Sequence, residues 1–374
     1  MRKCPYCDFN SHAVRDGIPE TAYIDALLRD LDVECARVGA TSDRDRPLMS
    51  IFIGGGTPSL FSGAAMRRLL DGVRSRCVVA DDAEVTLEAN PGTVDAAHFA
   101  GYAEAGVNRL SIGVQSMSDK SLERLGRIHS SADAQRAVAA ARAAGIDNLN
   151  LDLMFALPGQ DLAAAREDVQ RLLALAPTHI SYYELTLEPN TAFARQPPAL
   201  PDPDLADAIQ QQAFERLAAA GFERYEISAF ARPGARCRHN LNYWRFGDYL
   251  GIGAGAHGKL SDARSGTVAR RAKRRHPEAY LKADEPTSAV QTLSEQDLIE
   301  EFALNAFRLV EGFTAADFER NTGLSADALE PGLCAAAALG LVSRVDTGDG
   351  EQVVIRPTAR GLAFLNDLIA GFAA

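Results

Sequence analysis

Short apolar segments recur along the first half of the chain, and each ends at small or polar residues. They occupy residues 48–53, 85–87, 110–114, 149–155 and 180–187. Alanine-rich amphipathic stretches such as residues 132–144 and 163–176 lie between them, at intervals of about 25 to 40 residues, which is the size of a strand–helix unit. Because repeated units of this kind pair their strands in parallel, the sequence predicts an α/β fold with a parallel sheet, either open or closed into a barrel.

Glycine-rich or polar residues follow these predicted strands. Residues 54–58 are Gly-Gly-Gly-Thr-Pro, Glu88 and Gln115 end the next two strands, and Asp152 lies in the fourth. Functional residues of a βα barrel lie at the carboxyl ends of its strands. Glycines allow close approach to a ligand, and a carboxylate can accept hydrogen bonds from ribose hydroxyls. A plain turn is the alternative for the glycines alone, but the order of the motifs favours an active site along this edge.

The character of the sequence changes after residue 200. Prolines at 197, 198, 201 and 203 mark a turn, a helix is predicted over residues 205–220, and a segment rich in Arg, Gly and aromatic residues follows to residue 259. From about residue 293, helices, two strands, a turn at residues 347–350 and a closing helix predict a small winged-helix-like domain. We therefore predict a core barrel over residues 1–200, a barrel extension over 201–290 and a C-terminal domain over 291–374. A packing or lid role suits the C-terminal domain better than DNA binding.

The charge of the chain limits its partners. The 374 residues carry a net charge of -11, which disfavours nucleic acid. No apolar run reaches the length of a membrane span, and no signal peptide is visible at the start, so we expect a cytoplasmic protein. A solvated loop is the plainer interpretation of one local basic run, and a docking site for carboxylates or an acidic partner is the other. This run contains Arg264, Arg270, Arg271, Lys273, Arg274 and Arg275.

The six cysteines are not spaced like a disulfide framework. Cys4 and Cys7 form a Cys-x-x-Cys pair, which in a cytosolic chain indicates metal, cluster or redox chemistry. Both thiolates can converge on one iron-sulfur cluster, although two thiolates alone do not hold a four-iron cluster. Cys35, Cys77 and Cys334 lie in helix-like patterns and are predicted to be buried small apolar residues.

In this order the motifs resemble the radical S-adenosylmethionine family, whose hallmark is Cys-x3-Cys-x2-Cys followed by a glycine-rich strand end. Residues 3–11, Lys-Cys-Pro-Tyr-Cys-Asp-Phe-Asn-Ser, resemble the subgroup that contains coproporphyrinogen dehydrogenase and the heme chaperones. The likeness extends over nearly the whole chain, including residues 125–129, 150–154 and 249–258. It implies a partial (β/α)6 barrel that binds a [4Fe-4S] cluster and S-adenosylmethionine.

The resemblance also implies roles for single residues. Cys4 and Cys7 would be the second and third cluster ligands, and Tyr6 would contact S-adenosylmethionine through its backbone. The amino group of the cofactor would be held by Gly55, Gly56 and Thr57. Its ribose and carboxylate would be held by Glu88, Gln115, Arg127 and Asp152.

One departure from the family pattern concerns the start. The first motif cysteine would stand directly before Met1, and the first barrel strand is missing from the chain as well. Either the start is assigned at an internal codon, or the chain is truncated and cannot hold the cluster in the usual way. Because the motif is complete from Cys4 onward, we expect an in-frame cysteine codon directly upstream.

Two features distinguish the branches of the subgroup. Phe9 stands where the porphyrinogen dehydrogenases carry a further cysteine. Residues 239–244, His-Asn-Leu-Asn-Tyr-Trp, resemble the His-Asn-x-x-Tyr-Trp signature of the heme chaperones. Imidazole is a standard ligand of heme iron, and aromatic rings can stack on a porphyrin. A lone histidine is usually structural, but His239 stands beside the only tryptophan of the chain, which favours a heme ligand.

The resemblance therefore implies a heme chaperone that binds heme and transfers it to acceptor hemoproteins such as respiratory cytochromes. His257 and the basic run would serve as a second iron ligand and as propionate partners, and contact with a membrane would occur only through the partners. One alternative is an oxygen-independent coproporphyrinogen III dehydrogenase, which carries out an oxidative decarboxylation and against which Phe9 argues. Another is a clusterless binding or scaffold protein. Whether the chain is an enzyme stays open between these hypotheses.

Overall fold

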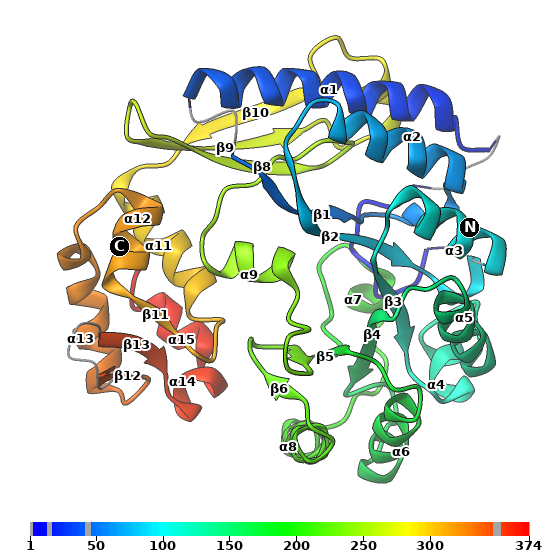
Figure 1. The fold of residues 1–374 in the computed structure, drawn as a ribbon. Coiled ribbons are helices and arrows are strands. Elements are labelled where there is room, and N and C mark those ends of the chain that lie inside the picture. Colours follow the sequence, from blue (N-terminus) through cyan, green and yellow to red (C-terminus); the bar gives the residue numbers. More distant parts are fainter. Residues whose placement is uncertain (1–2, 13–16, 42–45, 94, 347–352, 374) are drawn as a thin grey trace. The chain divides into compact units, whose positions relative to one another are not determined.

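The computed structural model describes residues 3–12, 17–41, 46–93, 95–346 and 353–373. The chain forms two compact units, which are described separately (Figure 1). The first comprises residues 1–28, 47–224 and 228–237, and the second comprises residues 29–46, 225–227 and 238–374. The division into domains at residues 200 and 290 stays a prediction, and the predicted turn at residues 347–350 lies outside the described residues.

A seven-stranded sheet forms the centre of the first unit, with the strand order β1-β2-β3-β4-β5-β7-β6. Strands β1 to β5 run parallel, whereas β7 pairs antiparallel with both β5 and β6. The five predicted strands are confirmed, and the α/β half-barrel agrees with the predicted partial barrel. The strands are β1 (Leu48–Ile53), β2 (Val79–Ala89), β3 (Arg109–Gln115), β4 (Asn148–Phe155), β5 (His179–Glu184), β6 (Glu223–Arg224) and β7 (Ala229–Ala231).

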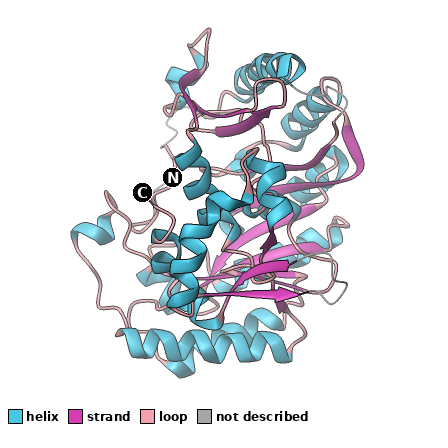
Figure 2. Ribbon diagram, turned by 90° about the vertical axis from the view of Figure 1, so that its left-hand side faces the viewer, coloured by secondary structure: helices cyan, strands magenta, loops and turns pink. Residues whose placement is uncertain are grey.

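Most of the helices that connect these strands cover one face of the sheet (Figures 1 and 2). Several begin at a side chain that caps the free backbone N–H groups of the first turn, as Ser62, Asp95, Ser130 and Asp161 do. The helices are α1 (Glu20–Thr41), α2 (Gly63–Arg74), α3 (Ala96–Ala105), α4 (Asp119–Arg124), α5 (Ser131–Ala143), α6 (Leu162–Leu173), α7 (Ala192–Arg195) and α8 (Pro203–Ala219), with short 3-10 turns η1 (Pro58–Leu60) and η2 (Pro91–Thr93).

The two faces of this sheet differ in polarity. On β2, Val85 and Leu87 are buried in the apolar core beneath the helices, while the alternate residues Glu84, Thr86 and Glu88 point to the other face. The same alternation continues on β3 and β4. Because the inner face of a half-barrel is not covered by helices, it carries the polar residues from which a site can be built.

The second unit contains α9 (Arg238–Trp244) and an antiparallel sheet of order β10-β9-β8. Its strands are β8 (His257–Asp262), β9 (Thr267–Lys273) and β10 (Thr287–Thr292), and α10 (Pro277–Leu281) precedes β10. A second antiparallel sheet, β11-β13-β12, packs with helices around a phenylalanine-rich core, as expected for a winged-helix-like fold. Its elements are α11 (Glu295–Ala306), β11 (Phe313–Thr314), α12 (Ala315–Thr322), η3 (Ala326–Leu329), α13 (Glu330–Ala338), β12 (Val342–Asp346), β13 (Val353–Pro357), α14 (Ala359–Ala363) and α15 (Leu365–Ala370).

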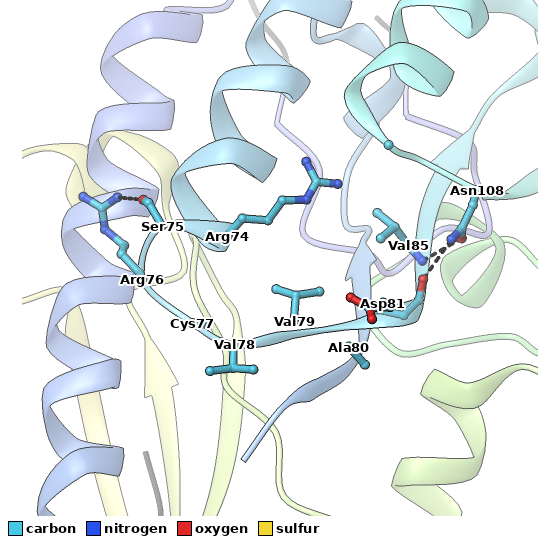
Figure 3. A pocket seen from close by; sticks show the side chains of 12 residues that line it. Arg74, Ser75, Arg76, Cys77, Val78, Val79, Ala80, Asp81, Val85 and Asn108 are labelled. Carbon is cyan, nitrogen blue, oxygen red and sulfur yellow. Dashed lines mark hydrogen bonds between the residues drawn. The ribbon is translucent and has the colours of Figure 1, made fainter. Parts of the chain in front are cut away.

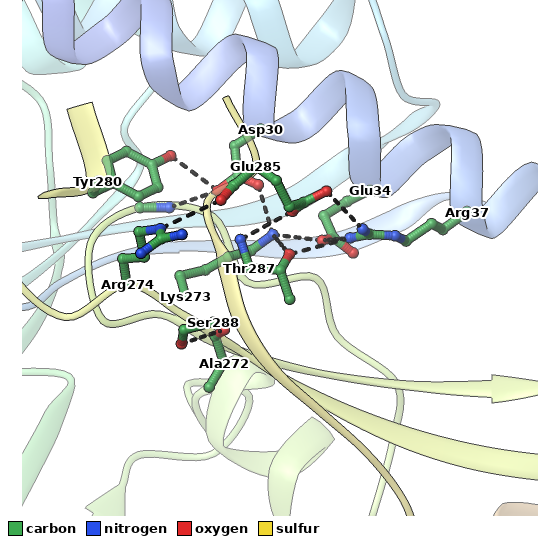
Figure 4. Close-up of polar contacts among 11 residues, drawn as sticks. Asp30, Glu34, Arg37, Ala272, Lys273, Arg274, Tyr280, Glu285, Thr287 and Ser288 are labelled. Carbon is green, nitrogen blue, oxygen red and sulfur yellow. Dashed lines mark hydrogen bonds and ion pairs between the residues drawn. The ribbon is translucent and has the colours of Figure 1, made fainter. Parts of the chain in front are cut away.

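The prediction of a solvated loop for the basic run is wrong for its central part, which is the strand β9. Lys273 is buried, and its Nζ lies 2.6 Å from carboxylate oxygens of both Asp30 and Glu34 (Figure 4). The hydroxyl of Tyr280 and the backbone N–H of Gly253 donate to Asp30 as well. Strand pairing and two carboxylates therefore hold a segment that looks like a solvated charge run in the sequence.

Candidate functional site

Residues 3–12 form a loop in which the two motif cysteines lie on one turn. The backbone N–H of Cys7 donates to the carbonyl of Cys4 at 3.1 Å, and both residues are partly buried. The backbone N–H of Phe193 donates to the carbonyl of Pro5 at 3.0 Å, and the ring of Tyr6 packs against that of Phe193. Both cysteines therefore lie on one turn of a loop that is held within the first unit by its contacts with Phe193.

Arg127 links this loop to the end of β3. One of its terminal nitrogens lies 3.7 Å from Sγ of Cys4, and the other donates to the carbonyl of Gly113 at 3.0 Å. The Nε–H of Arg127 is buried and has no hydrogen-bond partner among the described residues. A buried guanidinium with a free donor is suited to bind a carboxylate of a ligand.

The glycine-rich segment after β1 packs closely against β2. The backbone N–H of Gly55 donates to Oε2 of Glu88 at 3.1 Å. A Cβ added to Gly54 would come within 2.7 Å of the Phe52 ring and 3.0 Å of Glu88 Cδ. Gly55 has a φ of +122°, which side chains disfavour. The neighbouring side chains leave no space for a side chain at Gly54, and the backbone conformation favours glycine at Gly55. Gly55, Gly56 and Thr57 follow the strand end as predicted.

Gln115 ends β3 in a strained conformation, with a φ of +67°. Its side-chain oxygen accepts a hydrogen bond of 2.8 Å from the hydroxyl of Tyr183. Non-glycine residues with positive φ cluster at functional sites, where the surroundings hold them. Tyr183 was not singled out in the sequence; only its place in the alternation of β5 could have indicated that it faces the inner side.

Glu88 and Asp152 lie close together on the inner face of β2 and β4. Burial, followed by the charge of Asp152, raises the pKa of Glu88 to about 7. Burial raises the pKa of Asp152 to about 6, although hydrogen bonds from Asn150 and Ser181 oppose the shift. Two buried carboxylates with raised pKa values at strand ends are typical of a binding site and suit a cationic ligand.

The structure thus brings the predicted residues of the first unit together at the carboxyl ends of the strands. The chemistry of these side chains fits the expected cofactors. The two thiols suit iron, and the carboxylate and amide acceptors together with the guanidinium suit the hydroxyl, amino and carboxylate groups of S-adenosylmethionine. Among the residues that the structure describes, no group of three or more His, Cys, Asp or Glu side chains could hold a metal ion. The cofactor roles of these residues stay predictions.

His239 belongs to the second unit, where the heme-type motif forms the helix α9. The ring of His239 packs edge-on against Tyr243 with 4.7 Å between the centroids, and Tyr243 lies 4.4 Å from Tyr249. The guanidinium of Arg308 lies 4.9 Å above the Trp244 ring. The Trp244 indole N–H is buried without a hydrogen-bond partner within the described part of the chain. His239 and Tyr243 therefore form an aromatic cluster with Tyr249, Trp244 packs with Arg308, and His257 lies exposed at the start of β8.

Two further cysteines and one pocket lie away from this site. The prediction that Cys334 and Cys77 are buried helical residues is wrong, because Cys334 is exposed on α13 and Cys77 follows α2 in a loop. A pocket of about 750 Å³ lies between the end of α2 and the beginnings of β2 and β3 (Figure 3). Since it opens at the amino ends of the strands, it contains none of the predicted site residues.

None of the helices in the described ranges combines the length and the hydropathy that crossing a bilayer requires.

Residues 1–172 match the family model of the radical SAM superfamily, and residues 293–364 match that of the HemN C-terminal domain. The heme chaperone HemW of Escherichia coli (strain K12) is 47% identical over 374 residues, which cover all of this chain and 96% of that protein. The mitochondrial radical S-adenosyl methionine domain-containing protein 1 of Mus musculus is 38% identical over 84% of this chain and 72% of its own length.

A solved structure shares the fold over the full chain. Coproporphyrinogen III oxidase (HemN) from Escherichia coli, a radical SAM enzyme, superposes with a TM-score of 0.80 at 22% identity, covering all of this chain and 87% of that one. At 22% identity, this similarity shows that the two proteins share a fold. It agrees with the half-barrel and the C-terminal domain described above.

Proposed function

Since this chain belongs to the radical SAM superfamily and, within it, to the family of the heme chaperone HemW, we propose that it binds heme and delivers it to acceptor hemoproteins. The observation that carries the proposal is the aromatic cluster on α9, in which His239 packs against Tyr243 beside Trp244. Imidazole is a common axial ligand of heme iron, and a flat apolar macrocycle suits neighbouring aromatic rings. His239 is the iron ligand in this proposal.

The first unit binds the other cofactors in this proposal. Cys4 and Cys7 are thiolate ligands of a [4Fe-4S] cluster, which supplies electron-transfer chemistry when it is bound. The backbone of Tyr6 and the segment Gly55, Gly56 and Thr57 hold S-adenosylmethionine, together with four side chains of the strand ends. These are Glu88, Gln115, Arg127 and Asp152, of which the two acids favour the cationic cofactor and Arg127 favours its carboxylate.

The acceptors are hemoproteins, and respiratory cytochromes are the class that we propose. We also propose that the protein works in the cytoplasm and contacts a membrane only through such partners. Arg271, Arg274 and Arg275 carry positive charge at the end of β9 and are candidates for pairing with carboxylates of heme or of an acceptor. Nothing in the proposal requires nucleic acid.

Two measurements test the proposal. Anaerobically reconstituted protein is titrated with heme and followed at the Soret band, and the loaded protein is then mixed with an apo-cytochrome. Saturable binding followed by transfer of the heme spectrum to the acceptor is expected. Binding without transfer would reduce the protein to a heme-binding radical SAM protein, and conversion of coproporphyrinogen III would instead favour the dehydrogenase.

A further inference from the structure

A row of polar side chains crosses the inner face of the sheet beneath the predicted S-adenosylmethionine site. The strand register places Glu88 opposite Ser111, Ser111 opposite Asn150, and Asn150 opposite His179. Asn150 and His179 are 3% and 1% exposed, so neither can contact a ligand from solvent directly. Asp152 lies two residues beyond Asn150 on β4, and therefore on the same face.

The amide of Asn150 has a defined orientation. Its Nδ2 donates to Oδ1 of Asp152 at 2.8 Å and to Oγ of Ser111 at 2.8 Å. Its Oδ1 accepts from Oγ of Ser181 at 3.1 Å and lies 2.6 Å from Nδ1 of His179. Because an amide oxygen can only accept, His179 must carry its proton on Nδ1.

The histidine is suited to this fixed role. Burial, followed by the charge of Arg109, holds the pKa of His179 well below its ordinary value, so the ring is neutral. A neutral ring with its proton on Nδ1 donates to the Asn150 amide oxygen. Turning the Asn150 amide over would place its NH2 group against the Nδ1–H and its oxygen against the Asp152 carboxylate, which costs two hydrogen bonds.

We propose that Asn150, oriented by His179, is a positioning residue that holds the Asp152 carboxylate ionised and directed toward S-adenosylmethionine. The inference rests on the proposed cofactor role of Asp152 and adds two residues that do not touch the cofactor. An ionised carboxylate only accepts hydrogen bonds, whereas a protonated one also donates, so ionisation decides whether Asp152 can serve ribose hydroxyls and the positive charge of the cofactor.

The electrostatic surroundings explain why such support is needed. Burial disfavours the ionised form of Asp152, while the hydrogen bonds from Asn150 and Ser181 and then the charges of Arg109 and Arg127 oppose this effect in part. The pKa of Asp152 nevertheless lies at about 6. The titratable or charged groups around it are Glu88 on β2, Arg109 on β3, Arg127 beyond α4, Tyr183 on β5 and, one hydrogen bond further, His179.

The test follows the pH dependence of S-adenosylmethionine binding by calorimetry on the reconstituted protein. Asn150→Leu should raise the pH at which half of the affinity is lost by about one unit, because a hydrogen bond to the charged form is gone. A shift of that size makes binding roughly fivefold weaker at pH 6. His179→Leu should shift the midpoint in the same direction, and His179→Asn, which keeps a donor, should restore it.

Asn108→Leu is the matched control, since the Asn108 amide hydrogen-bonds the backbone of β2 and, among the described residues, makes no hydrogen bond to Asp152. An equal midpoint shift in this control, or none in folded Asn150→Leu and His179→Leu, would overturn the inference. If Asn150→Leu does not fold, the midpoint shifts of His179→Leu and His179→Asn test the inference in its place. Infrared titration of the protonated carboxyl band in protein without the cofactor gives a second readout. Absence of S-adenosylmethionine binding in the parent protein would instead contradict the proposed function.

Discussion

The backbone N–H of Gly55 donates a hydrogen bond of 3.1 Å to the carboxylate of Glu88, which joins the end of β1 to the end of β2. Gly54 leaves no space for a side chain at this point, because a Cβ would meet the Phe52 ring at 2.7 Å. The glycine-rich segment and the acid therefore form one structural unit, and a change in either should alter the site.

Glu88→Ala should weaken S-adenosylmethionine binding while iron content stays nearly unchanged, because the change removes an acceptor and no cysteine. A lost charge-assisted hydrogen bond corresponds to roughly ten- to a hundredfold in affinity. Calorimetry and iron analysis measure the two effects. Glu104→Ala, which removes an exposed glutamate paired only with Arg67, is the control and should bind normally. Unchanged affinity in Glu88→Ala would remove Glu88 from the site.

The contribution of Glu88 and Asp152 to the stability of the cofactor-free protein should fall as the pH rises from about 4 to 7, whereas that of the buried His129 and His179, whose pKa values are lowered, should rise. Folding raises the pKa of Glu88 to about 7 and that of Asp152 to about 6, whereas both groups titrate at lower pH in the unfolded chain. In this window the two folded carboxyl groups retain protons that they have lost in the unfolded chain, so their contribution to the free energy of unfolding decreases with pH. Urea denaturation across this range measures the slope. Glu88→Gln removes the share of Glu88, so the free energy of unfolding of the variant relative to the parent should rise with pH. A variant curve parallel to the parent curve would contradict the assignment.

His239→Ala should alter the Soret band of the heme complex and weaken heme binding, because an axial ligand is lost. S-adenosylmethionine affinity should hardly change, since the residues proposed to bind it lie in the other unit. His98→Ala, at a histidine paired with Asp95, is the control and should leave the spectrum unchanged. A lower melting temperature with an unaltered heme spectrum would assign His239 a purely structural role.

Lys273→Met should destabilise the second unit by about 3 to 5 kcal/mol, because it leaves Asp30 and Glu34 buried without their shared ammonium group. Chemical denaturation measures the loss. Lys282→Met is the matched control, since this lysine side chain is 80% exposed and pairs only with Glu278 on the surface. A loss below 1 kcal/mol in Lys273→Met would show that the cluster in Figure 4 is not a stabilising element.

The sequence by itself predicted the elements that local patterns encode. The apolar run at residues 48–53 became β1, and the amphipathic stretch at 163–176 became the helix α6 over Leu162–Leu173. A hydrophobic period reports which face of a segment is buried, and parallel strands align their carboxyl ends, so the location of Glu88, Gln115 and Asp152 along one edge could be expected in advance.

The tertiary structure alone decided which polar residues meet. Lys273 pairs with Asp30, which precedes it by 243 positions, and the hydroxyl of Tyr183 reaches Gln115 across 68 positions. A charged residue within a basic run has the same local pattern whether it is solvated or buried, because its partner lies on another element. Likewise, Asn150 and His179 look like ordinary strand residues until the register of β4 and β5 places them opposite one another. Register depends on packing across strands that are distant in sequence, and no local propensity encodes it.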